Sequence, residues 1–161
     1  MAELREQVKR KFGDAVLSTH ADFGDQTVLL RKESALEVMR WLRDDPSMLF
    51  NFMMDLTAVD YLGKKPGDQR FEVVYHLYSL KHNHRIRVKA PVAEDDPTID
   101  SVVSIWKGAD WFEREAWDLY GIIFKGHPNL KRILLYEEFV GHPLRKEYPI
   151  RKRQPLIGPE N

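Results

Sequence analysis

The sequence predicts an α+β fold, with a mainly antiparallel β-sheet, helices packed on one face of it, and an extended C-terminal arm. Short amphipathic helix patterns flank long segments rich in aromatic and β-branched residues, which are typical of strands. After Gly121 the sequence shows no long segment with the periodicity of a helix or a strand. A chain of 161 residues fits one domain with a trailing extension. We therefore expect a core domain at residues 1–121 and an extended arm at residues 122–161.

Composition narrows the possible functions. The chain has no cysteine, which excludes disulfides, cysteine-bound zinc and cysteine-ligated iron–sulfur clusters. Its 25 basic and 25 acidic residues balance, unlike the net basic charge of non-specific nucleic-acid binders. The N-terminus carries no apolar signal segment, and the longest apolar runs are about five residues, too short to span a bilayer. We expect a soluble intracellular domain that meets a membrane only through a partner.

The N-terminal third predicts a helix, a β-hairpin and a second helix. Apolar residues at i, i+4 and i+8 mark the first helix, which Gly13 ends: Leu4, Val8 and Phe12. Two apolar runs, 15–17 and 27–30, flank a Gly-Asp turn and predict the hairpin. The spacing Ser34-x-x-Glu37 is typical of a capping box and predicts the start of the second helix. Its buried face is expected to comprise Ala35, Val38, Met39 and Leu42.

The middle of the chain predicts three strands. Segments 49–61 and 71–80 are rich in aromatic and β-branched residues and are expected to be long central strands. Residues 63–68 between them form a turn-rich loop. Segment 85–90 alternates between two faces, as in a half-buried strand of an antiparallel sheet. Its faces are Arg85, Arg87 and Lys89 on one side and Ile86, Val88 and Ala90 on the other.

Two further helices are predicted after these strands. Asp96-Pro97 is a favourable start for the first of them. Its core face would comprise Ile99, Val102, Val103 and Trp106. Asp110-x-x-Glu113 would start the second helix, with Glu113 as the capping partner of Asp110, and Gly121 would end it.

The second of these helices is apolar on more than one side. Its large apolar residues are Trp111, Phe112, Trp117, Leu119 and Tyr120. Such a helix must be buried on more than one side, by the sheet and the arm or by another chain. The carboxylates of Glu113 and Glu115 point to different faces, so they cannot converge on one substrate. Arg114 is placed to pair with Asp118 at i+4.

The arm holds five of the nine prolines, but it is also rich in apolar residues that disordered segments lack. We therefore expect an ordered arm that lies on its own domain or on a neighbouring chain. It contains two Gly-His-Pro turns, and each is followed by a basic pair: Lys131-Arg132 after the first and Arg145-Lys146 after the second. His127 and His142 could be catalytic bases, but we favour histidines that bind backbone groups in tight turns.

The residues alone leave three classes of function open. The common phosphate-loop, hydrolase and zinc-protease signatures are missing, and His82 and His84 have cationic neighbours that oppose a divalent ion. A stand-alone enzyme would use His127 or His142 with a nearby acid as its base. A single-strand nucleic-acid binder would use the cations of segment 85–90. An assembly subunit would dock through its charge-segregated segments, which are basic at 81–89, acidic at 92–120 and basic at 125–161.

Two blocks of sequence resemble one known family closely. They are EREAWDLYGIIFKGHPNLKRIL at 113–134 and GHPLRKEYP at 141–149. The pattern is similar to that of the C subunit of bacterial NADH–quinone oxidoreductase, which is the thirty-kilodalton subunit of respiratory complex I. Glu147 stands where many relatives carry Asp. The motif positions that carry the resemblance are Glu113, Arg114, Glu115, Trp117, Asp118, Gly121, His127, Pro128, Arg132, Gly141, Pro143, Leu144, Arg145, Lys146, Tyr148 and Pro149.

The resemblance implies a non-catalytic structural subunit in the cytoplasm-facing peripheral arm of a proton-translocating complex at the inner membrane. It implies no flavin, iron–sulfur cluster or metal on this chain; FMN, iron–sulfur clusters, NADH and quinone belong to the complex as a whole. Its partners would be neighbouring peripheral-arm subunits, chiefly the large quinone-site subunit, and iron–sulfur subunits. The alternative is the equivalent subunit of a related membrane-bound hydrogenase or of another complex I-like oxidoreductase. Five residues are assigned to the structure of the helix start and to its interface: Glu113, Arg114, Glu115, Trp117 and Asp118. Arg145 and Lys146 are assigned to docking.

Overall fold

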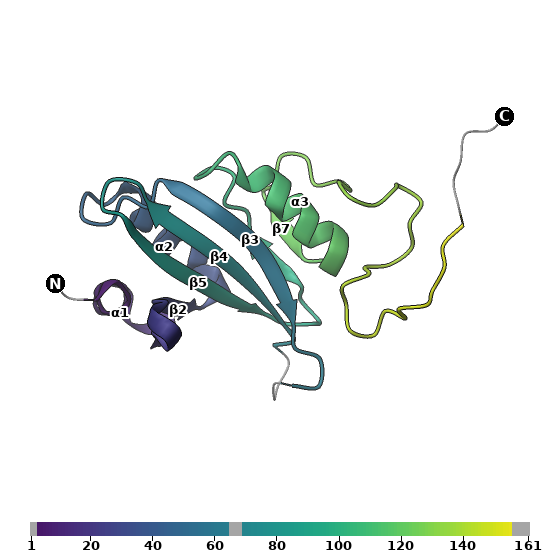
Figure 1. The fold of residues 1–161 in the computed structure, drawn as a ribbon, viewed down its shortest axis with the longest axis horizontal. Helices are drawn as coiled ribbons and strands as arrows, with labels where there is room; N and C mark the ends of the chain where they lie inside the picture. Colours follow the sequence, from purple (N-terminus) through teal and green to yellow (C-terminus); the bar gives the residue numbers. More distant parts are fainter. Residues whose placement is uncertain (1–2, 65–68, 156–161) are drawn as a thin grey trace.

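The computed structural model describes residues 3–64 and 69–155, so residues 65–68 of the predicted loop and 156–161 of the arm lie outside the described residues (Figure 1). Five strands form one mixed, mostly antiparallel sheet in the order β1-β2-β5-β4-β3. Only the β2–β5 pair within it is parallel. The strands are β1 (Val16–His20), β2 (Thr27–Leu30), β3 (Phe52–Asp60), β4 (Phe71–Ser79) and β5 (His84–Val92). The predicted α+β fold is confirmed, as are the hairpin and the three central strands.

In the part of the chain that the structure describes, three α-helices accompany the sheet: α1 (Leu4–Phe12), α2 (Lys32–Asp44) and α3 (Ala109–Tyr120). Gly13 ends α1 as predicted. The predicted capping box at Ser34 is wrong, because α2 begins two residues earlier and Ser34 lies in its first turn, where its N–H donates to the Arg31 carbonyl. A capping residue needs extended backbone, which Arg31 supplies instead. None of the helices within the described residues is long and apolar enough to cross a bilayer.

The apolar core lies on one face of the sheet. Alternate residues of β4 and β5 point into it, as the alternation of segment 85–90 predicts: Val73, Tyr75, Leu77, Ile86, Val88 and Ala90. Helix α2 buries the face predicted for it, comprising Ala35, Val38, Met39 and Leu42. Helix α1 packs beside α2, with the rings of Phe12 and Trp41 edge to face at 5.4 Å between centroids. Figure 1 shows α3 alongside β3, at the opposite end of the sheet from α1.

The helix predicted from Asp96-Pro97 does not form. Residues Thr98–Asp100 are a strand, β6, which pairs in parallel with β7 (Ile123–Lys125). Turns follow up to residue 108. The apolar residues assigned to this helix are nonetheless buried: Ile99, Val102, Val103 and Trp106. Their spacing fits a strand followed by a tight turn as well as a helix, and pairing with a segment far along the chain decides between the two.

We expect Leu77→Ala to lower the free energy of unfolding by about 2–5 kcal/mol, because it leaves a cavity in the core. Leu77 is 0% exposed, whereas Leu80, three residues further along, is 64% exposed. Leu80→Ala is therefore the control and should change stability by less than about 0.5 kcal/mol. Urea unfolding of the two variants measures both values, and equal losses would contradict the placement of the core.

Candidate interaction site at the junction of helix α3 and the arm

Asp118 is the centre of the junction between α3 and the arm. Its carboxylate is buried, yet Oδ2 accepts hydrogen bonds from the backbone N–H groups of Ile133, Leu134 and Leu135 at 2.9–3.1 Å. Oδ1 accepts a further bond from Arg132 at 2.5 Å. Burial by itself would raise the pKa of Asp118, but these donors outweigh it and hold the pKa below its ordinary value. A charged carboxylate therefore fixes three consecutive arm residues to the helix.

Arg132 links this carboxylate to the next part of the arm. Its guanidinium also donates to the carbonyl of Phe139 at 2.6 Å. The same group lies 5.8 Å from the ring centroids of both Trp117 and Phe139. Arg132, from the first basic pair, thus connects helix α3 to the segment that leads to the second Gly-His-Pro turn.

Arg114 holds the arm at a second point on α3. It donates to the carbonyls of Lys131 at 3.1 Å and Arg132 at 2.9 Å. The predicted ion pair between Arg114 and Asp118 is wrong, because Asp118 is occupied by the arm and Arg114 lies 4.0 Å from Asp110. An i+4 spacing permits such a pair, but the buried carboxylate gains more from the backbone donors and Arg132.

The second Gly-His-Pro block closes over the C-terminal end of α3. Arg145 donates to the carbonyl of Tyr120 at 2.6 Å, and the N–H of Leu144 donates to the carbonyl of Leu119 at 3.1 Å. A ring nitrogen of His142, Nδ1, lies 2.9 Å from the carbonyl of Asp118. These carbonyls of the last helical turn have no partner within the helix, so the arm supplies it. A cation is also favoured at this end of a helix dipole.

Gly121 is required where the two segments meet. Its φ of +76° is in the left-handed region, and it caps α3 as predicted. A Cβ atom at this position would lie 2.7 Å from both the ring of His142 and the guanidinium of Arg145. Any other residue would therefore strain the backbone and displace the second block from the helix.

A buried ion pair ties the arm to the sheet as well. Arg70 donates two hydrogen bonds to the Asp60 carboxylate, at 2.9 and 2.7 Å, and further bonds to Glu94 and Glu147. The backbone N–H of Lys146 donates to Asp60 at 2.8 Å. Burial opposes ionisation of Asp60, but Arg70 and the backbone donors lower its pKa to about 2. The side chain of Lys146 itself stays exposed.

Sequence reasoning did not identify Asp60 or Arg70. The two residues flank the loop between β3 and β4, and the β3–β4 register brings Asp60 opposite Phe71. The signal that could have found them is the hairpin itself, because an acid ends its first strand and a base directly precedes its second strand. A further partner of Arg70 is Glu147, from the second motif block.

Glu113 is buried on the other side of α3. It accepts hydrogen bonds from the Ser101 hydroxyl at 2.6 Å and from the Val102 N–H at 2.7 Å. The predicted capping role toward Asp110 is wrong, because Gly108 caps the helix and Asp110 lies within its first turn. Burial raises the pKa of Glu113 to about 7, although its two donors oppose the shift. Glu115 is exposed, so the two carboxylates point to different faces as predicted.

The histidines of both turns contact main-chain atoms. His127 Nδ1 accepts the N–H of Asn129 at 2.9 Å, and Nε2 lies 3.2 Å from the carbonyl of Asp110. The His127 side chain is completely buried. Burial, together with the charge of Arg145, lowers the pKa of His142, although the Asp118 carbonyl opposes the shift. Neither imidazole is presented to solvent as a free base.

The remaining motif residues lie within the arm or contact it. Tyr148 stacks on Phe139 at 6.1 Å between ring centroids and lies close to Gly141, whose φ is +101°. Trp117 is half-buried beneath Arg132. Pro143 is half-buried, whereas Pro128 and Pro149 are exposed. Within residues 3–64 and 69–155, no group of three or more His, Asp or Glu side chains could hold a metal ion.

The sequence of the chain is similar to that of known proteins along most of its length. A family model described as "Respiratory-chain NADH dehydrogenase, 30 Kd subunit" matches residues 28–154. The chain is 51% identical over 154 residues to the C subunit of NADH-quinone oxidoreductase of Citrifermentans bemidjiense, covering 94% of this chain and 92% of that protein. It is 44% identical to the same subunit of Geobacter metallireducens, covering 98% of each.

Solved structures share the fold. A structure of the trypsin-resistant fragment (1-134) of Nqo5 is 35% identical and has a TM-score of 0.68, covering 78% of this chain and 95% of that one. A chain from an archaeal membrane-bound sulfane sulfur reductase has a TM-score of 0.73 at 20% identity, covering 91% of this chain and 84% of that one. At that identity the second likeness is one of fold alone.

We expect Asp118→Asn to lower the free energy of unfolding by about 2–4 kcal/mol, because an amide cannot replace the charge that four donors surround. Glu115→Gln removes an exposed carboxylate from the same helix and is the control, with an expected change below about 0.5 kcal/mol. Urea unfolding at pH 7 measures both variants. Similar values for the two would show that Asp118 does not anchor the arm.

Glu113 should give the stability a characteristic pH dependence. Its folded pKa of about 7 exceeds the ordinary value of 4.5, so the folded state binds the extra proton between these values. Its contribution to stability is therefore lost as pH rises. The free energy of unfolding of Glu113→Gln, taken relative to that of wild type, should therefore rise by about 2.5 kcal/mol between pH 5 and pH 8. His76 and His142, whose pKa values are also shifted, affect both proteins equally, so their effect cancels in the difference between the two curves. Parallel stability curves across this range would rule out the raised pKa.

Proposed function

The chain belongs to the family of the 30 kDa subunit of respiratory-chain NADH dehydrogenase, which is the C subunit of NADH-quinone oxidoreductase, and from that premise we propose what its residues do. The proposed role is structural and non-catalytic: the chain holds neighbouring peripheral-arm subunits in place. Those subunits carry electrons from NADH through FMN and iron–sulfur clusters to quinone, coupled to proton translocation. This chain has no cysteine with which to ligate a cluster.

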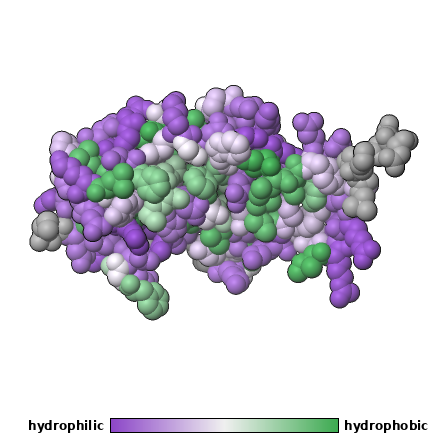
Figure 2. Space-filling view, turned by 45° about the horizontal axis from the view of Figure 1, so that its top comes forward, coloured by the Kyte–Doolittle hydropathy of each residue, from purple (hydrophilic) through white to green (hydrophobic). Residues whose placement is uncertain are grey.

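The exposed apolar side chains around α3 and the arm carry this proposal. Figure 2 shows apolar atoms gathered in a broken band between hydrophilic regions on this side of the molecule. Soluble monomers rarely expose large contiguous apolar patches, so such a surface supports contact with another polypeptide. Exposed tryptophan and tyrosine side chains, here Trp111 and Tyr136, are also suited to anchor an interface. The exposed large apolar residues of this region are Trp111, Ile123, Leu134, Tyr136, Val140, Leu144 and Ile150.

The proposed partner of the arm is the large quinone-site subunit, together with iron–sulfur subunits. The structure of the related Nqo5 is that of a trypsin-resistant fragment, which spans less than the full length of this chain. Tryptic sites are frequent in the arm described here, for example Lys131, Lys146 and Arg151. Lys131, Lys146 and Arg151 are exposed in this chain, which supports an arm surface that partners cover in the complex. The chain would then lie on the cytoplasmic side of the inner membrane, attached through the complex.

Two alternatives have less support. The relatives at 43–51% identity carry the name of NADH-quinone oxidoreductase, which favours NADH as the donor over a membrane-bound hydrogenase. A histidine-dependent enzyme would need an accessible base. His127 is buried and bound to main-chain atoms, and His142 faces the end of α3.

We expect Leu134→Asp to prevent assembly of the complex while leaving the isolated chain stable. Leu134 is 60% exposed, so a carboxylate there is solvated in the free chain but buried without a partner in an apolar interface. The variant should be expressed in the native host in place of the wild-type chain. Native gels and membrane NADH oxidation then report assembly, and the melting temperature of the purified chain reports its fold.

Leu80→Asp is the matched control, because Leu80 is similarly exposed but lies in the turn between β4 and β5, away from α3 and the arm. It should assemble normally. If Leu134→Asp assembles as well as Leu80→Asp, the arm surface is not an interface and the proposed role is wrong.

A further inference from the structure

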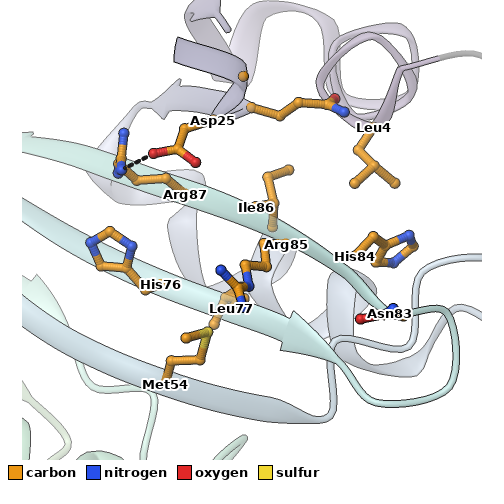
Figure 3. Close-up of a pocket in the computed structure, with 12 residues that line it drawn as sticks. Leu4, Asp25, Met54, His76, Leu77, Asn83, His84, Arg85, Ile86 and Arg87 are labelled. Carbon is orange, nitrogen blue, oxygen red and sulfur yellow. Dashed lines mark hydrogen bonds and ion pairs between the residues drawn. The ribbon is translucent and has the colours of Figure 1, made fainter. Parts of the chain in front are cut away.

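A cavity on the polar side of the sheet has no part in the junction with the arm. Its volume is about 470 Å³, which lies within the range of small-molecule sites. Strands β4 and β5 form its floor, and α1 and the turn at Asp22–Gly24 contribute its wall (Figure 3). Two arginines, Arg85 and Arg87, line it from the same strand.

The strand register places the polar groups of this cavity on one face. Tyr78 lies opposite Arg85, and His76 lies opposite Arg87, so each arginine has a cross-strand neighbour. The two arginines are separated by one residue and therefore point to the same side of the sheet, about 7 Å apart along the strand. Figure 3 shows Arg85 and His76 in front of the ribbon, while Arg87 reaches toward Asp25.

The positive charge in the cavity is only partly neutralised. Arg87 donates to Asp25 at 2.8 Å and lies 3.5 Å from the Thr27 hydroxyl, so other N–H groups of its guanidinium stay available. Arg85 makes no ion pair with any carboxylate among the described residues, and its guanidinium lies 5.6 Å from the ring centroid of Tyr78. Asp25 is the only carboxylate among the described lining residues.

The groups around Arg85 are held in place before any ligand binds. The Tyr78 hydroxyl donates to the Asn83 side chain at 2.5 Å, which fixes the ring against which Arg85 rests. Burial, and then the charge of Arg87, lower the pKa of His76, so at neutral pH its ring offers hydrogen bonds without charge. Leu4 and Met54 add apolar surface to the walls. A concave site with convergent donors and some apolar lining is typical of a small-ligand site.

We propose that this cavity binds a small organic anion, whose carboxylate or phosphate group pairs with Arg85 and Arg87 while its carbon skeleton lies against Met54. Guanidinium groups recognise both anions through paired N–H donors. The concave shape favours a small molecule over a flat protein contact. This site is independent of the arm, so it adds a ligand function to the structural role.

Isothermal titration of the full chain tests this site, with citrate as the carboxylate probe and inorganic pyrophosphate as the phosphate probe. Both titrations are made at pH 7 and constant ionic strength, because exposed charges are screened by salt. We expect saturable one-to-one binding of at least one probe, with a Kd below about 1 mM. The probe that binds identifies the anionic group. Arg85→Gln should weaken that binding about tenfold or more.

Arg40→Gln is the matched control, since Arg40 is an exposed arginine on α2, away from the cavity. Its affinity should stay within about twofold of wild type. Three results would overturn the site: no saturable binding of either probe, equal weakening by the two substitutions, or tighter binding of a hexaglutamate peptide than of both probes. The last result would assign this face to an acidic segment of a protein instead.

Discussion

The buried carboxylate of Asp118 is the constraint on which the C-terminal third of the structure depends. Residues 122–155 of the arm form no helix or long strand and so have few backbone partners of their own, and buried N–H groups that lack a partner are costly. Asp118 supplies one acceptor group to three consecutive N–H donors and to Arg132. The carboxylate lies on a helix that packs against the sheet. The arm residues bound to it are therefore held in a fixed position relative to the domain.

Charged side chains also make the other contacts that hold the irregular backbone of the arm. Arg114 and Arg145 donate to main-chain carbonyls, one on the arm and one at the end of α3. Arg70 and Asp60 bring the second block to the edge of the sheet. With polar groups directed inward, large apolar side chains such as Leu134 and Val140 remain at the surface. The charged residues of the two motif blocks therefore hold the arm in the position that exposes this apolar surface.

Much of the fold follows from local pattern, and most of the junction does not. The helices and central strands were predictable because apolar periodicity reports burial directly, as in Ala35–Leu42 and segment 85–90. The strand at Thr98–Asp100 was not, because its partner is β7, beyond α3. Asp118 was expected to pair with Arg114 along the helix, whereas its real partners come from the arm. Glu113 shows the same limit, since Ser101 and Val102 reach it through tertiary packing.

Amide hydrogen exchange of the isolated full chain tests this central role of Asp118 most directly. The N–H groups of Ile133, Leu134 and Leu135 lie in a segment without regular structure, so only the carboxylate can protect them. We predict that all three exchange slowly, with protection comparable to that of amides within α3. Exchange at the rate of an unstructured peptide, while the amides of β4 and β5 stay protected, would show that Asp118 does not hold the arm.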